Sequence, residues 1–282
     1  MYLIIHNPLS RNRKGKRATK KLIKYLNKTN QDFMLRSSLK INDINDYLKN
    51  KSEDDKVLIT GGDGTINYLI NKFDFTAINH QIYLEKSGSG NDFLRTLKKK
   101  GMANTDIFEV SFNDQKKKFV NSCGMGVDSL VCHYVNKSKH KNKLSYFFNA
   151  LKAIKNYKPS KLHLEVDGLE YDFNKALFIT TQNGKYFGGG MKVAPRAELD
   201  DGKLSVIVCH NMSKAFVFFV FISIYLGLHT KLKKKVFMIE GSNIKATMEN
   251  TVMLETDGEV YQDINTIEIS KKDTLTITKF KK

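Results

Sequence analysis

The sequence predicts a parallel α/β domain followed by a domain built mostly from antiparallel strands. Up to about residue 120, short apolar runs alternate with helix-like segments, which is the order of βαβ units. Beyond residue 130, one amphipathic helix precedes many strand-like runs. The 282 residues are enough for two ordinary domains with ample core. We therefore expect domains over 1–125 and 126–282, with the last strands left free to pack back on the first domain.

The first half alternates four strands with four helices. Each apolar run is short enough for a buried strand, and a segment with helical spacing of apolar residues follows it. The expected strands are Tyr2–Ile5, Phe33–Leu35, Val57–Thr60 and Ile82–Leu84, and the expected helices are Lys14–Leu26, Ile41–Leu48, Ile66–Phe73 and Asp92–Leu97. Ligands of parallel sheets bind beyond the carboxyl ends of the strands. The glycine turns that follow two of these strands are therefore candidate binding loops.

The second half begins with a helix in which Leu144, Phe147, Phe148, Leu151 and Ile154 share one face. Two alternating runs then flank Asp167-Gly168, which predicts a hairpin. Further strands are expected at Ala176–Thr180, Leu204–Val208, Val236–Ile239, Ile244–Met248, Val252–Glu255, Thr266–Ile269 and Leu275–Thr278. This succession indicates a mostly antiparallel sheet.

Composition limits the partners and the compartment. The formal net charge of +18 favours an anionic partner, which leaves nucleic acid, nucleotide and anionic membrane open. The three cysteines are odd in number and lack metal-type spacing, as expected for reduced thiols in the cytoplasm. No charged leader precedes an apolar segment, so no signal peptide is predicted.

The stretch Gly61-Gly62-Asp63-Gly64-Thr65 is the strongest candidate binding loop, because it lies between a predicted strand and a predicted helix. Glycines let the backbone approach a ligand closely, and Thr65 is expected to cap the helix, whose N-terminus attracts phosphate. A carboxylate beside phosphate needs a cation between them, so Asp63 indicates a Mg²⁺-nucleotide site. The alternative is a plain Asp-Gly turn that ends a buried strand.

Four other turns carry polar residues, and each has a plain structural alternative. Paired carboxylates in a turn can hold a hard cation, and a carboxylate in a hairpin turn can act as a general base. The four turns are Asn7-Pro8-Leu9-Ser10, Ser87 to Phe93, Asp200-Asp201-Gly202-Lys203 after Gly188-Gly189-Gly190-Met191, and Asp257-Gly258-Glu259. The P-loop, Gly-x-Gly-x-x-Gly and His-x-x-x-His patterns do not occur, so P-loop enzymes, dinucleotide dehydrogenases and protein kinases are not indicated.

Taken in order, these motifs resemble the diacylglycerol kinase catalytic-domain family, with soluble bacterial lipid kinases the nearest in pattern. The resemblance includes Asn121 with Gly124-Met125-Gly126-Val127-Asp128 and runs from Asn7 to Glu259. It implies a Rossmann-like parallel α/β domain and a C-terminal antiparallel β-sandwich domain, as in NAD kinases. Two departures lie at the nucleotide site: Arg11-Asn12-Arg13 replaces the family's Gly-x-Gly, and Lys86-Ser87 replaces its Pro-Leu.

The resemblance also implies an activity, its cofactors and its residues. ATP and Mg²⁺ would be bound by the first domain and a lipid between the domains, with transfer of the γ-phosphoryl group to a lipid hydroxyl, diacylglycerol being favoured. Glu259 would be the general base, Asp63 would lie near the catalytic Mg²⁺, and a second Mg²⁺ would sit at Asp201 with backbone carbonyls of Glu198 and Lys203. The nucleotide residues implied are Asn7, Pro8, Ser10, Ser38, Gly61, Gly62, Asp63, Gly64, Thr65, Ser89 and Asn91.

One segment bears on the partner without any resemblance. Ala215–Leu228 is almost wholly apolar, and at ~1.5 Å per residue it is too short for a ~30 Å bilayer core. Because Lys231 and Lys233–Lys235 follow, we expect docking on an anionic membrane and peripheral association; the alternative is a buried helix. A soluble-metabolite kinase of the NAD-kinase type and a non-catalytic nucleotide-binding module stay open, as does a homodimer. No nucleic-acid partner is expected, since no basic stripe with regularly interleaved aromatics occurs in the first domain.

Overall fold

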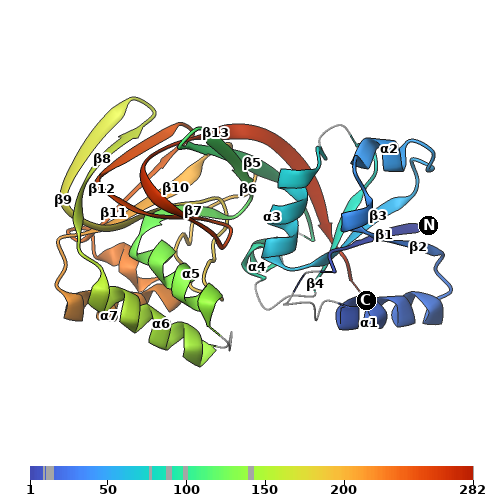
Figure 1. Cartoon of the computed structure of the whole chain (residues 1–282), viewed down its shortest axis with the longest axis horizontal. Helices are drawn as coiled ribbons and strands as arrows, with labels where there is room; N and C mark the ends of the chain where they lie inside the picture. The colour runs from blue at the N-terminus through green and yellow to red at the C-terminus, as the bar shows by residue number, and fades with distance from the viewer. Residues whose placement is uncertain are drawn as a thin grey trace. The chain divides into compact units, whose positions relative to one another are not determined.

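The computed structural model describes residues 1–8, 10, 16–75, 78–86, 91–97, 101–138 and 143–281, with side chains of 143–146 excepted. The chain forms two units, Met1–Thr105 with Asp273–Lys282, and Asp106–Lys272 (Figure 1). The sequence placed a boundary near residue 125. Residues 106–125 belong to the second unit because β7 (Ser122–Gly126) pairs with two strands of that unit. Each unit is described by itself below.

The first unit is built on a parallel sheet in the order β4-β3-β1-β2. Its strands are β1 (Tyr2–His6), β2 (Phe33–Ser37), β3 (Lys56–Gly61) and β4 (Ile82–Lys86), and its helices are α1 (Lys16–Lys28), α2 (Ile44–Leu48), α3 (Asp63–Lys72) and α4 (Asp92–Leu97), with the 3-10 turn η1 (Ser38–Lys40). The chain leaves β1 for β2 on one side and returns to β3 on the other. The strand order therefore reverses between β1 and β3, where parallel sheets bind ligands.

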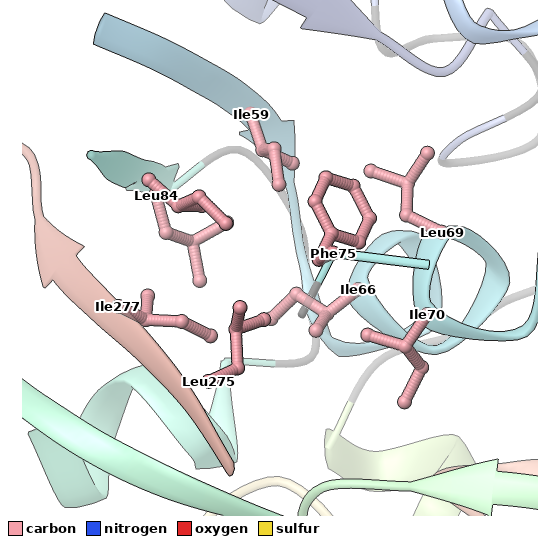
Figure 2. Close-up of a pocket in the computed structure, with 9 residues that line it drawn as sticks. Ile59, Ile66, Leu69, Ile70, Phe75, Leu84, Leu275 and Ile277 are labelled. Carbon is pink, nitrogen blue, oxygen red and sulfur yellow. The ribbon is translucent and has the colours of Figure 1, made fainter. Parts of the chain in front are cut away.

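The end of the last strand, β13 (Glu259–Lys279), completes this sheet. Ile277 pairs in parallel with Ile82 of β4, and Leu275 and Ile277 point into the core against α3 (Figure 2). The space among these side chains is only about 10 Å³, about one water-sized sphere, and its lining is wholly aliphatic and aromatic. This space is therefore a packing void rather than a ligand site.

The second unit is an antiparallel sheet system in the order β11-β10-β9-β7-β12-β13, with β8 pairing with β12 and β9. The strands are β5 (Met102–Phe112), β6 (Gln115–Phe119), β8 (Ser160–Val166), β9 (Leu169–Gln182), β10 (Leu204–His210), β11 (Val236–Gly241) and β12 (Ile244–Thr256); the helices are α5 (Val127–Lys137), α6 (Lys143–Asn156) and α7 (Lys214–Tyr225), followed by η2 (Leu228–Lys231). Asp167 and Gly168 form the β8–β9 hairpin turn, both with positive φ, as the Asp-Gly pair predicts.

Two hydrophobic cores lie on opposite faces of β10. Val206 and Val208 face a core enclosed by strands, whereas Ile207 and Cys209 face a core shared with α5, α6 and α7. The three helices lie on one side of the strands (Figure 1). Because both faces of β10 are buried, its sequence is apolar throughout rather than alternating.

Several elements differ from expectation. Ala176–Thr180 is part of β9, and Ile244–Met248 and Val252–Glu255 are one strand whose pairing with β13 shifts register between Thr247 and Val252. Polar residues inside these long strands made the runs look separate. Helix α5 and strands β5–β7 were not anticipated.

Candidate active site

The first unit gathers the predicted nucleotide residues at the carboxyl ends of its strands. His6 of β1 pairs in register with Ser37 of β2 and Thr60 of β3. The residues that follow these three positions therefore lie along one edge of the sheet. They include Asn7, Ser38 and the loop Gly61–Thr65. This edge is the candidate nucleotide site.

The glycine loop leads directly into α3, and two of its positions differ from the sequence reading. Helix α3 begins at Asp63 with Gly62 as N-cap, which makes no side-chain capping bond. Thr65 is therefore not the cap: it is buried in the first turn, and its N–H donates to the carbonyl of Gly62 at 2.9 Å. A Cβ at Gly61 would lie 2.2 Å from the Thr65 Cβ, so packing alone demands glycine there.

Gly64 has no such structural explanation. A Cβ on Gly64 would meet nothing within 4 Å, and its φ is not positive. Neither packing nor backbone conformation therefore requires glycine at this position. An open surface at the first turn of a ten-residue helix lets a ligand approach the backbone N–H groups and the positive end of the helix dipole.

Asp63 connects two helices. Its Oδ2 accepts a hydrogen bond from the backbone N–H of Asp92 at 2.8 Å. Asp92 is buried at the start of α4 and is paired with Arg95 at 2.9 Å. Asn91, another predicted residue, directly precedes α4. Ser89 lies outside the described residues.

The remaining predicted residues lie at the ends of β1 and β2. The N–H of Ser10 donates to the Asn7 carbonyl at 3.2 Å, which closes the turn containing Pro8. Ser38 is fully buried in η1, and its Oγ has no hydrogen-bond partner among the described residues. His6, which sequence reasoning did not select, ends β1; burial, followed by the charge of Lys16, lowers its pKa.

In the second unit, Asp257 and Glu259 have different structural roles. Asp257 is buried and accepts backbone hydrogen bonds from Val120, Asn121 and Ser122, each at 2.9 Å. It therefore fixes the β12–β13 turn to the start of β7. Glu259 is exposed at the first position of β13. Its carboxylate is presented to solvent by a turn that the neighbouring residue holds in place.

Two carboxyl groups that the sequence analysis did not assign are buried next to this turn. Glu255 accepts from Ser122 Oγ at 3.2 Å and from the Gly258 N–H at 3.0 Å, and burial, then the charge of Asp128, raises its pKa. Burial raises the pKa of Asp128 to about 7. Asp128 Oδ1 accepts from the N–H of Ser129 at 2.8 Å, whereas Oδ2 has no hydrogen-bond partner within the described residues.

Asp128 also lines a cavity of about 50 Å³ beneath α5, α6 and α7. At ~10–15 Å³ for each water-sized sphere, it holds about four such spheres. Apart from Asp128 and the Cys209 thiol, the lining is aliphatic, aromatic or methionine: Val127, Val131, Ala150, Ile154, Phe178, Phe187, Met191, Met212, Val217, Val220, Phe221 and Ile224. In the sequence, the feature that could have pointed to Asp128 is the glycine four residues before it. A Cβ at Gly124 would lie 2.4 Å from the unpartnered Oδ2, so a larger residue there would collide with the carboxyl group.

The predicted cation site at Asp201 lies in an exposed turn. Asp201 Oδ1 accepts from the Lys203 N–H at 3.0 Å, and the side chain of Glu198 pairs with Lys185. Nearby, the Gly202 N–H donates to the buried Asp106 at 2.6 Å, and Lys271 Nζ lies 2.7 Å from the same carboxylate. The ammonium of Lys271 thus already balances the buried charge of Asp106. The residues around Asp201 therefore do not fit a metal ion well. The Asp201 site stays a prediction.

Comparison with known proteins gives matches over nearly the whole chain. Residues 1–120 match the diacylglycerol kinase catalytic domain, and residues 121–277 match the YegS C-terminal NAD kinase beta sandwich-like domain. A diacylglycerol kinase of Mycobacterium tuberculosis is 25% identical over 226 residues, covering 74% of this chain and 70% of that protein. A diacylglycerol kinase of Bacillus subtilis is 24% identical over 224 residues, covering 73% and 72%.

The fold also matches a solved structure. A crystal structure of a diacylglycerol kinase from Bacillus anthracis superposes with a TM-score of 0.66 at 19% sequence identity, covering 98% of this chain and 96% of that one. At this identity the likeness concerns the fold. It agrees with the predicted α/β domain followed by a β-sandwich-like domain.

Proposed function

Because the chain belongs to the diacylglycerol kinase family, whose kinases use ATP, we propose that it transfers the γ-phosphoryl group of ATP to the hydroxyl of diacylglycerol, forming phosphatidic acid. Membership of the family supports a lipid kinase in general, and the choice of diacylglycerol as the substrate is the more specific part of the proposal. The observation that favours a lipid acceptor is the apolar lining of the cavity in the second unit. At about 50 Å³ this cavity holds only a small part of an acyl chain, so a longer chain would have to widen it between α5, α6 and α7.

The nucleotide half of the proposal rests on the glycine loop. The open surface at Gly64 and the first turn of α3 suit a phosphate group, which would accept hydrogen bonds from backbone N–H groups there. Asn7, at the neighbouring end of β1, would contact the rest of the nucleotide, whereas Ser38 is fully buried and would reach a ligand only after a rearrangement of η1. Gly61 serves the loop differently, since it lets α3 start close against β3.

Carboxylate oxygens are the ligands that Mg²⁺ prefers, and Asp63 supplies them beside the proposed phosphate site. Asp63 therefore fits a Mg²⁺-nucleotide and would hold the ion, whereas the Asp92 carboxylate is already paired with Arg95. When bound, Mg²⁺ would neutralise charge on the transferring phosphoryl group. The hydrogen bond from the Asp92 N–H fixes the orientation of the Asp63 carboxylate before any ligand arrives.

Glu259 would accept the proton of the lipid hydroxyl. An alcohol is a weak nucleophile near pH 7, and a carboxylate within hydrogen-bond reach of its proton assists attack on phosphorus. The exposed position of Glu259 leaves its oxygens accessible to a substrate. The three backbone bonds to Asp257 keep the turn in place, so little reorganisation is needed when the lipid binds.

The test is transfer of labelled γ-phosphate from ATP, with Mg²⁺, to diacylglycerol, phosphatidylglycerol or sphingosine in mixed micelles and to NAD in solution. We expect label in diacylglycerol and none in any acceptor when Glu259→Gln is assayed at short times. Label in another lipid alone would overturn the choice of substrate. Label in NAD alone would make the protein a soluble-metabolite kinase, and ATP binding without any transfer would make it a nucleotide-binding module.

A further inference from the structure

Helix α7 presents a stripe of large apolar side chains to solvent. The exposed fractions are 58% for Phe219, 47% for Ile222, 44% for Tyr225, 70% for Leu226 and 45% for Leu228 just beyond the helix. Along α7, steps of three or four residues from Phe219 place these side chains on one face. Scattered exposed apolar residues are ordinary, whereas a contiguous stripe of this kind marks an interaction site.

The opposite face of the same helix is already used by the fold. Val217, Val220 and Ile224 are buried in the core beneath α7, and they line the cavity that contains Asp128. A helix at the surface of a globular protein normally carries polar residues on its outer face. From Ala215 to Leu228 there is no charged residue at all. The outer stripe is therefore not explained by packing within the unit.

In sequence, the helices that contain and adjoin the stripe carry almost no acidic residue. The segments 129–164 and 203–239, which contain most of α5 and all of α6 and α7, have no Asp or Glu. They carry eight and six lysines, respectively. An apolar stripe on helices whose charged residues are almost all lysines matches an anionic surface with an apolar interior.

Three of these lysines follow the stripe directly. Lys231, Lys233 and Lys234 are exposed, and within the described part of the chain none forms an ion pair. Lys235 differs, because its ammonium donates to the Asn211 carbonyl. The side chain of Lys192 also lies close to Gly227 at the end of α7.

We propose that the docking face, defined as Phe219, Ile222, Tyr225, Leu226 and Leu228 with Lys231, Lys233 and Lys234, binds the surface of an anionic lipid bilayer. The apolar side chains would enter the acyl boundary while the ammonium groups contact lipid phosphates. Among the described residues no helix is long and apolar enough to cross a membrane. Helix α7, with 12 residues, would lie in the plane of the interface.

This inference rests on the proposed function and deepens it, because a lipid substrate has to be taken from a bilayer. The inner face of α7 lines the cavity and its outer face would lie in the membrane. A single helix would then separate the bilayer from the cavity. Docking therefore places the proposed lipid cavity next to the source of its ligand.

The test is sedimentation of the full chain with vesicles of phosphatidylcholine containing 30% phosphatidylglycerol, without ATP, at low and high salt. We expect the combined variant Lys231→Gln, Lys233→Gln, Lys234→Gln to bind about 100-fold more weakly at low salt, since each basic residue near such a surface adds roughly fivefold. The difference should shrink at high salt. The double variant Phe219→Ser, Leu226→Ser should lose at least about tenfold at either salt.

Matched control variants distinguish binding by the docking face from nonspecific electrostatic or hydrophobic binding elsewhere on the protein. Lys20→Gln, Lys21→Gln, Lys24→Gln removes the same charge from the exposed side of α1, and Leu169→Ser removes a leucine that is 59% exposed in the β8–β9 hairpin. Both should bind vesicles within about twofold of wild type. Circular dichroism and thermal unfolding of each variant verify that it is folded.

Three results would overturn the proposal. The first is that the wild-type protein does not bind anionic vesicles, and the second is that the control variants lose as much vesicle binding as the docking-face variants. The third is that the docking-face variants change only the oligomeric state, which would assign the face to a second copy of the chain. Phosphoryl transfer to dioctanoylglycerol in detergent micelles is measured in parallel. A docking-face variant that loses vesicle binding but still phosphorylates the micellar substrate supports the docking proposal. Absence of transfer by the wild-type protein contradicts the proposed function and leaves the docking result unaffected.

Discussion

The buried Asp128 should make the second unit less stable as pH rises. In the unfolded chain its carboxyl titrates near the ordinary value of 3.8, whereas burial raises the folded pKa to about 7. Between these values the folded state holds a proton that the unfolded state has released, so stability falls with rising pH. Above pH 7 the loss of unfolding free energy is complete, and it amounts to about 4 kcal/mol at ~1.4 kcal/mol per pKa unit.

The variant Asp128→Asn removes this titration and keeps the side-chain shape. The informative quantity is the difference between variant and wild type as pH changes, because the packing of the amide does not depend on pH. Part of this difference comes from Glu255, whose pKa is also raised by the charge of Asp128. From pH 5 to pH 8, Asn should gain about 3 kcal/mol relative to Asp. At ~2–4 °C per kcal/mol, its thermal midpoint should rise by roughly 6–12 °C relative to wild type.

Differential scanning calorimetry at pH 5, 6.5 and 8 measures this change, with the transition of the second unit followed separately. Asp114→Asn, in the exposed β5–β6 turn, is the matched control and should show no such trend. A constant difference between Asp128→Asn and wild type over this pH range would refute the reasoning. It would mean that water or a neighbouring group stabilises the ionised carboxylate in the folded protein.

Three further predictions concern catalysis. Asp63→Asn keeps an acceptor for the Asp92 N–H but removes the negative charge, so phosphoryl transfer should fall by orders of magnitude with an unchanged thermal midpoint; wild-type turnover would contradict the role. Glu259→Gln should lower kcat by about 10²–10⁴ with little change in ATP affinity, and weaker ATP binding at normal kcat would exclude a general base. Gly64→Ala should fold normally and bind ATP more weakly in calorimetric titration, whereas Gly61→Ala should lower the thermal midpoint because its Cβ meets Thr65; equal behaviour of the two variants would remove the argument for a ligand at Gly64.

Sequence reasoning reached the first unit more completely than the second because its strands are separated by helices that pack on them locally. The run Val57–Thr60 and the glycines after it fix β3 and its turn without reference to distant residues. Helix α5 was missed because it follows β7 with no polar N-cap: Gly126 precedes it with a φ of 115° and makes no side-chain capping bond.

The local structure of a candidate loop was predictable where the motif folds through its own backbone. Gly61–Thr65 is such a motif, although the reading of Thr65 as a cap was wrong, whereas Asp257 is held by the distant residues Val120 to Ser122. The roles of these residues in the site stay predictions. Asp106 and Glu255 could not be recognised, because their importance comes from burial by strands far away in the chain. Asp106, for example, meets Gly202 and Lys271, which are 96 and 165 residues further along.

The return of the last strand has a consequence for how the protein is made. Leu275 and Ile277 fill the core against α3, and Ile277 pairs with β4, yet both are made only after the whole second unit. Domains usually fold in the order of synthesis, N-terminal first. Here the opening 105 residues lack an edge strand and part of their core until residues 273–282 have been added. A nascent chain that stops before these residues would therefore expose an open β4 edge, and the glycine loop of α3 would gain a stable support only after the second unit has been made.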